Sequence, residues 1–85
     1  LAEVEELLLS HEKRWDESAL ATRRTLVTFR VATAALRGLR AGMAVEEIAR
    51  GLSGLRGRLR EVGGPSGVES FGPKVREVFR LLQQP

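Results

Sequence analysis

The chain has 85 residues, enough for one domain with a modest hydrophobic core. It contains no Cys and one His, which excludes disulfides, thiol catalysis, Cys-ligated zinc and a His-rich metal site. Its formal net charge of +3 is too small to indicate nucleic-acid binding by itself.

The first predicted element is a long helix, or a pair of helices, over residues 2–40. Residues 1–37 contain neither Gly nor Pro, the strongest helix breakers. Apolar residues follow heptad spacing at both ends of this stretch: Leu1, Val4, Leu8 and Trp15, then Phe29, Leu36 and Leu39. Between them the same positions are polar, at His11, Ser18, Thr22 and Thr25. The pattern therefore predicts a break or bend between residues 10 and 18, with Ser10 or Asp16 as the new N-cap.

Charge is distributed unevenly along the chain. Residues 1–17, the acidic head, hold six carboxylates and two basic residues, a net charge of −4. Residues 18–62 carry a net charge of +6, and residues 63–85 add +1. An acidic head and a basic body can pair within one chain or between two chains, and a solvated surface of mixed sign is the alternative.

The second predicted element is one amphipathic helix over residues 44–62, after a turn around Gly38 and Gly42. Its apolar residues alternate spacings of three and four: Val45, Ile48, Leu52, Leu55, Leu59 and Val62. Gly51, Gly54 and Gly57 each cost about 0.5–1 kcal/mol relative to Ala inside a helix, so packing must hold this helix. The same small residues allow another helix to approach closely.

Residues 63–67 are predicted to form a loop, because they combine Gly with Pro and Ser. Pro73 follows Gly72 and is typical of the first residue of a helix. A short helix is predicted over residues 73–83, with an apolar face made of Val75, Val78, Phe79 and Leu82. The expected fold class is therefore all-α. We expect a small helical bundle in a single domain over residues 1–85, whether or not the chain is part of a longer protein.

The unequal helix lengths predict a partner. A continuous first helix of about forty residues spans roughly 60 Å, and the second helix covers only about half of that. Unless the first helix folds back, apolar residues of the head have no partner in the chain: Leu7, Leu8, Leu9 and Trp15. Trp15 is the single Trp and is surrounded by charged residues, a pattern that favours an interface anchor over a core residue.

Residues 42–52 resemble the first helix of bacterial helix-turn-helix regulators. The core positions of that motif correspond to Ile48, Ala49, Leu52, Leu59 and Val62. The resemblance implies that Arg56, Arg58 and Arg60 lie on a recognition helix near phosphates or bases. Ser53 and Gly54 depart from the turn of the motif, and the apolar register through residues 53–55 favours one continuous helix. DNA binding is therefore the alternative hypothesis.

Catalysis is not expected from this chain. The carboxylates within residues 3–6 and 46–47 lie near predicted helix starts, where acidic side chains stabilise the helix dipole. The glycines of residues 63–67 lack the strand and the Gly-Lys-Ser/Thr sequence of a phosphate-binding loop. We expect no cofactor and no metal. No stretch approaches the ~20 apolar residues that span a bilayer, and no signal peptide is visible, so we expect an intracellular protein.

The sequence thus predicts a non-catalytic helical protein–protein interaction or oligomerisation module, of scaffold or adaptor type. Its partner is a second copy of the chain or a helical segment of another protein. The residues expected to form the core or the interface are Leu8, Trp15, Val45, Ile48, Leu52, Leu55 and Leu59. Arg56 and Arg58 are expected to pair with the acidic head and set the orientation, at about 0.2–1 kcal/mol each.

Overall fold

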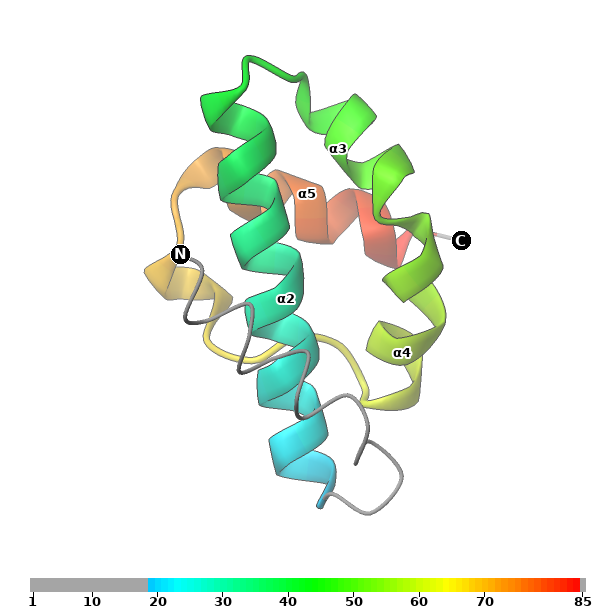
Figure 1. Cartoon of the computed structure of the whole chain (residues 1–85). Coiled ribbons are helices and arrows are strands. Elements are labelled where there is room, and N and C mark those ends of the chain that lie inside the picture. The colour runs from blue at the N-terminus through cyan, green and yellow to red at the C-terminus, as the bar shows by residue number, and fades with distance from the viewer. Residues whose placement is uncertain (1–18, 85) are drawn as a thin grey trace.

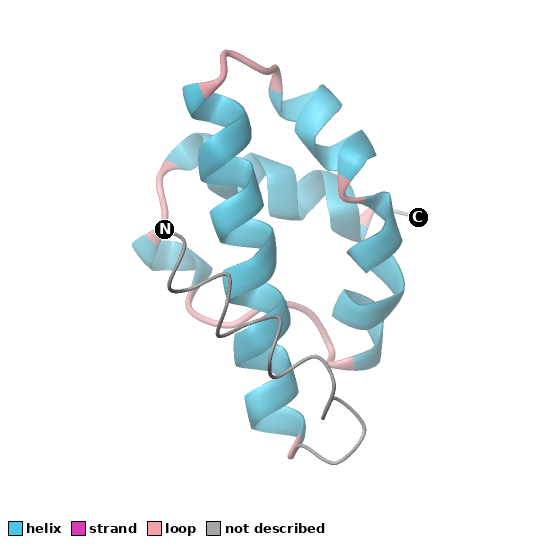
Figure 2. Ribbon diagram, in the orientation of Figure 1, coloured by secondary structure: helices cyan, strands magenta, loops and turns pink. Residues whose placement is uncertain are grey.

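The computed structural model describes residues 19–84, and every element in this range is helical (Figure 1, Figure 2). In chain order these elements are α2 (Leu20–Arg40), α3 (Val45–Gly51), the 3-10 turn η2 (Ser53–Leu55), α4 (Arg56–Glu61), the 3-10 turn η3 (Val68–Ser70) and α5 (Pro73–Gln83). The all-α prediction is confirmed. The acidic head and the break predicted between residues 10 and 18 lie outside the described residues.

Helix α2 ends where the sequence predicts, at a glycine in the left-handed conformation. Gly42 has a φ of +82°, a region that residues with a Cβ rarely occupy. The amide of Gly42 donates to the carbonyl of Leu39 at 3.1 Å, and that of Met43 donates to the carbonyl of Gly38 at 2.9 Å. These two bonds form a Schellman motif, which satisfies carbonyls that the helix end leaves unpaired. The turn directs the chain back along α2.

The prediction of one continuous helix over residues 44–62 is wrong. The structure divides this segment into α3, η2 and α4, with η2 in the glycine-rich stretch. At the break the amide of Leu55 donates to the carbonyl of Leu52 at 2.9 Å, the tighter spacing of a 3-10 turn. Gly51 is the last residue of α3 and Gly54 lies within η2, and the low helix propensity of Gly lowers the cost of leaving α-helical geometry there.

Helix α5 begins at Pro73 and ends at Gln83, as predicted. The loop before it contains three glycines with positive φ, at residues 63, 64 and 67. Within this loop lies η3, which the sequence analysis did not predict. The segment from α3 to α4 runs antiparallel to α2, and α5 crosses behind both (Figure 1).

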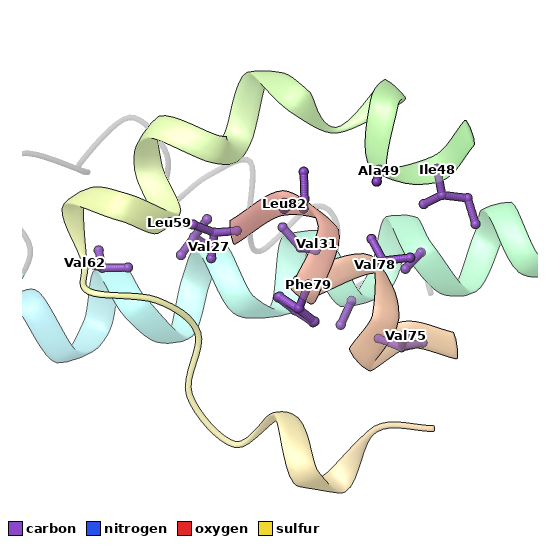
Figure 3. Close-up of a cluster of buried hydrophobic side chains, with 12 residues drawn as sticks. Val27, Val31, Ile48, Ala49, Leu59, Val62, Val75, Val78, Phe79 and Leu82 are labelled. Atoms are coloured by element: carbon purple, nitrogen blue, oxygen red, sulfur yellow. The ribbon is translucent and has the colours of Figure 1, made fainter. Parts of the chain in front are cut away.

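The hydrophobic core forms where these helices meet (Figure 3). The four α-helices, together with the C-cap residue of α4, contribute side chains that are almost fully buried: Val27, Val31, Ala32, Ala35, Ile48, Ala49, Leu59, Val62, Val75, Val78, Phe79 and Leu82. Phe71 stacks on Phe79 with 6.1 Å between ring centroids. Removal of this apolar surface from water is the main force that holds the short helices together.

Among residues 19–84, no helix is both long enough and apolar enough to cross a lipid bilayer.

Candidate protein-interaction groove

Two adjoining pockets lie between α2 and the α3–η2–α4 segment. The first has a volume of about 410 Å³ and is lined by Ala34, Arg37, Gly38, Ala41, Met43, Ile48, Gly51 and Leu52. The second has a volume of about 350 Å³ and is lined by Arg30, Gly51, Leu52, Gly54, Leu55 and Arg58. The two pockets share Gly51 and Leu52 in their linings, and we call them together the α2–α3 groove.

One wall of the groove is a single face of α2. Arg30, Ala34, Arg37 and the C-cap residue Ala41 are separated by four, three and four residues, which places them in one row along the helix and its end. At 1.5 Å per residue, this row is about 16 Å long. The wall therefore alternates two arginines with two alanines.

The opposite wall is formed by α3, η2 and the start of α4, and two of its residues, Gly51 and Gly54, have no side chain. A Cβ atom added to Gly51 or Gly54 would find no atom within 4 Å beyond its chain neighbours and the adjacent helix backbone. These glycines are therefore not required for packing within the described part of the chain. Leu52 and Leu55 lie half-buried beside them and supply apolar surface. A chain segment in the groove can approach the backbone closely at both glycines.

The charged side chains that line the groove are all basic among residues 19–84. Three arginines line it: Arg30, Arg37 and Arg58. None of the five carboxylates within residues 19–84 lines either pocket. Those residues contain twelve basic and five acidic side chains, a net charge of +7.

Other arginines stabilise the fold. Nε and Nη2 of Arg24 both donate to the carbonyl oxygen of Val62, at 3.0 and 2.8 Å. Nη1 of Arg23 contacts Oε1 of Glu61 at 2.9 Å. Nη1 of Arg56 donates to the carbonyl oxygen of Gln84 at 2.7 Å, which ties the start of α4 to the end of α5. Arg24 and Arg56 thus pair with carbonyls at or beyond helix C-termini, where a cation is favourable.

One exposed ion pair on α5 shifts the pKa of both of its side chains. Arg80 and Glu77 lie on the same face of α5, and Nε of Arg80 donates to both carboxylate oxygens. The hydrogen bond from Arg80 lowers the pKa of the Glu77 carboxyl, although partial desolvation opposes the shift. The same hydrogen bond raises the pKa of Arg80. This pair does not line the α2–α3 groove.

The structure separates the predicted core-or-interface residues into two groups. Ile48 and Leu59 are core residues, with 3% and 1% of their surface exposed, and Ile48 also lines the groove. Val45, Leu52 and Leu55 are half-buried against the core, and of these Leu52 and Leu55 line the groove. Arg58 lines the groove, while Arg56 bonds to Gln84. Leu8 and Trp15 lie outside the described residues.

The sequence analysis missed the α2 side of the groove. Two signals for it are present in the sequence. Arg30 and Arg37 are seven residues apart, and so are Ala34 and Ala41, which places each pair on one face of a helix. Met43 was also missed; it lines the groove with 40% of its surface exposed.

A smaller pocket of about 170 Å³ lies on another side of α2, between Phe29 and the loop that contains η3. It is lined by Thr25, Thr28, Phe29, Ser66, Gly67, Ser70 and Phe71. Three of its hydroxyl groups are engaged locally, since Thr25 bonds to the carbonyl of Ala21, Thr28 to that of Arg24 and Ser70 to that of Gly67. The α2–α3 groove is larger and more strongly charged.

Over residues 19–84, no cluster of three or more His, Cys, Asp or Glu side chains is arranged to hold a metal ion. Comparisons with protein-family models, with curated proteins and with solved structures give no match to this chain.

Proposed function

We propose that this chain is a helical protein–protein interaction module that associates with itself and has no catalytic role. The observation that carries the proposal is the α2–α3 groove, with its apolar floor, its two exposed glycines and its arginines. Binding of an amphipathic helix in a groove between helices is a common mode of peptide recognition. A groove about 16 Å long accepts about eleven residues of such a helix.

The lining of the groove also supports a non-catalytic role. Its described side chains are those of Ala, Leu, Ile, Met and Arg, together with the backbone of Gly. These include no nucleophile and no pair of groups that exchange a proton near neutral pH. Arginine and apolar residues are, by contrast, typical of the centre of a protein–protein interface.

DNA binding through a helix-turn-helix remains the alternative, and two observations make it the weaker one. Helix α4, which would have to read the bases, has only six residues. Of the arginines that the motif would direct at DNA, Arg56 bonds to the carbonyl of Gln84 and Arg58 lines the groove. A recognition helix needs such side chains free to enter the major groove.

The test of the proposed function is the solution mass of the full chain, measured by sedimentation equilibrium from low to high micromolar concentration. We expect the mass to rise from that of a monomer to that of a dimer or a larger assembly. A monomer at every concentration, with no change in mass, overturns self-association. Duplex DNA binding that weakens steeply with salt in the same samples would favour the alternative.

A further inference from the structure

We infer that Ser53 is a phosphorylation site for a protein kinase that recognises arginine three residues before the acceptor, and that its phosphate then binds Arg56 of the same chain. This inference is independent of the proposed function. It follows from the exposure of Ser53, from the arginines spaced around it, and from the weak packing of the turn that carries it.

The hydroxyl of Ser53 is available as a nucleophile. Ser53 begins η2, and its side chain is exposed. Thr25, Thr28 and Ser70 donate their hydroxyls to backbone carbonyls, whereas the Ser53 hydroxyl has no such bond to any residue in the range 19–84. In the reaction, Oγ of Ser53 bonds to the γ-phosphorus of ATP while the bond from that phosphorus to the β–γ bridging oxygen breaks. ADP leaves, and the hydroxyl proton passes to the catalytic carboxylate of the kinase.

Arg50 gives Ser53 a charge pattern that a kinase can select. It is exposed and lies three residues before the acceptor. Kinases choose substrates partly by such charge patterns, and a guanidinium can bond to a carboxylate of the kinase through two donors. One other hydroxyl in the chain has the same spacing, since Arg30 lies three residues before Thr33. The sequence alone therefore does not choose between Ser53 and Thr33.

The fold distinguishes these two acceptors. A helical turn has to open locally before a kinase can hold its acceptor in an extended segment, and the cost of opening rises with the buried contacts that are lost. Thr33 is 9% exposed in the middle of α2, and Val31 and Ala35 beside it are fully buried in the core. The turn that carries Ser53 is three residues long and has no buried residue. Opening at Ser53 thus disturbs far less packing than opening at Thr33.

The phosphate has a partner in Arg56, three residues after Ser53. Residues three apart are eclipsed in 3-10 geometry, which brings the two side chains to the same side of the segment. Nη1 of Arg56 donates to the carbonyl of Gln84 at 2.7 Å, in an exposed hydrogen bond. A phosphoserine carries a charge of about −1.5 to −2 near neutral pH, so its oxygens are stronger acceptors than a neutral carbonyl. Phosphorylation therefore draws the guanidinium from Gln84 and releases the tie between α4 and the end of α5.

The experiment treats the folded full chain with magnesium, ATP and a purified serine kinase, and locates the phosphate by mass spectrometry. The kinase is chosen because it modifies two short peptides equally well, residues 47–59 and residues 27–39 with Thr33→Ser. The full-chain variants are Ser53→Ala, Arg50→Gln and Thr33→Ser, of which the last places the same hydroxyl at the buried position. Circular dichroism melting of each variant shows that it is folded.

We expect the folded wild type to take up one phosphoryl group, at Ser53. Ser53→Ala should take up none, and Arg50→Gln should react at least about tenfold more slowly, because it lacks the charged donor. Thr33→Ser should be modified at Ser53 alone, although its buried serine is accepted in the peptide. No phosphate at Ser53 of the folded wild type overturns the inference, and so does phosphate at residue 33 of the folded Thr33→Ser chain.

Phosphorus-31 NMR of the phosphorylated chain tests the contact with Arg56. A guanidinium beside the phosphate favours the dianion, so the second pKa of the phosphate should be lower in the wild type than in Arg56→Met. The matched control is Arg60→Met, which removes the same charge from an exposed residue of α4 and should leave that pKa as it is in the wild type. Equal phosphate pKa values in the wild type and Arg56→Met overturn the contact.

Discussion

Arg24, in the second turn of α2, holds the C-terminal end of α4 through Val62. Its guanidinium donates from both Nε and Nη2 to one carbonyl oxygen, at 3.0 and 2.8 Å. Val62 is the C-cap of α4, and the next residue, Gly63, has a positive φ. The carbonyls there have no partner within the helix, so the charged donor satisfies one of them and also complements the helix dipole. This contact fixes the start of α2 against the end of the opposing segment.

Arg24→Met should lower the free energy of unfolding by about 1.5–3 kcal/mol, the usual contribution of a hydrogen bond to a charged group. Met keeps the length of the side chain and much of its packing, so the loss reports the hydrogen bonds. Arg24→Lys keeps the charge and one donor and should lose less. Urea unfolding followed by circular dichroism measures both. Equal stability of the Met variant and the wild type contradicts this role.

Replacement by Ala should change the stability of the fold in opposite directions at two glycines, Gly38 and Gly57. A Cβ on Gly38 would lie 2.6 Å from Cγ1 and 2.8 Å from Cδ1 of Ile48, a buried side chain. Gly38→Ala should therefore destabilise the fold by about 1–3 kcal/mol through overpacking. A Cβ on Gly57 meets nothing within 4 Å, so Gly57→Ala should stabilise the fold by about 0.5–1 kcal/mol.

Thermal melting of the two glycine variants gives a paired comparison, since both substitutions add one methyl group. Unchanged stability in Gly38→Ala is inconsistent with the close contact between α2 and α3 at Ile48, and a loss of stability in Gly57→Ala is inconsistent with open space around that residue.

Thr28 connects the loop of residues 63–67 to α2. Its buried hydroxyl donates to the carbonyl of Arg24 at 2.7 Å and accepts from the amide of Ser66 at 3.1 Å. Thr28→Val preserves the shape of the side chain but removes the acceptor for that amide. Hydrogen exchange at the Ser66 amide should become faster in Thr28→Val and stay slow in Thr28→Ser. Unchanged exchange in the Val variant means that the loop is held by other contacts.

The ion pair of Glu77 with Arg80 predicts a small pH dependence of stability. Its pKa is lowered in the folded chain by the hydrogen bond from Arg80, so the pair adds stability above the pKa that Glu has in the unfolded chain. This contribution is lost as the pH falls through the lower, folded pKa. In Arg80→Ala the Glu77 carboxyl should titrate at higher pH, which NMR of the carboxyl carbon detects. Because the pair is exposed, the melting temperature near neutral pH should hardly change, and a large drop would contradict this description.

Short-range signals predicted most of the fold. The start of α5 follows from Gly72 and Pro73, and the end of α2 follows from the glycine at residue 42, because these residues act through local backbone geometry. The apolar stripe of residues 45–62 faces the core as its spacing indicates, even though the helix is interrupted. The interruption at η2 was missed, because an apolar register is preserved when a single turn tightens from α to 3-10 geometry.

The groove was only half predictable. Leu52, Leu55 and Arg58 were identified from the pattern of their own segment. Arg30, Arg37 and Met43 were not, because they become part of a site only when α2 packs against α3. Which face of α2 borders the groove depends on the Schellman turn after Arg40 and on the contact between Gly38 and Ile48. These are tertiary relationships, and periodicity within one helix does not contain them.

The most direct test of the account uses Met43, the single Met of the chain, whose side chain lines the groove with 40% of its surface exposed. Full chain labelled with carbon-13 at the methionine methyl is mixed with unlabelled full chain, and isotope-filtered NOEs are recorded at high micromolar concentration. The account predicts intermolecular NOEs from the Met43 methyl to protons of the unlabelled copy, and a methyl shift that changes with concentration. A methyl shift independent of concentration, without intermolecular NOEs in a sample that sediments as a dimer, would contradict the assignment of the α2–α3 groove as the interaction surface.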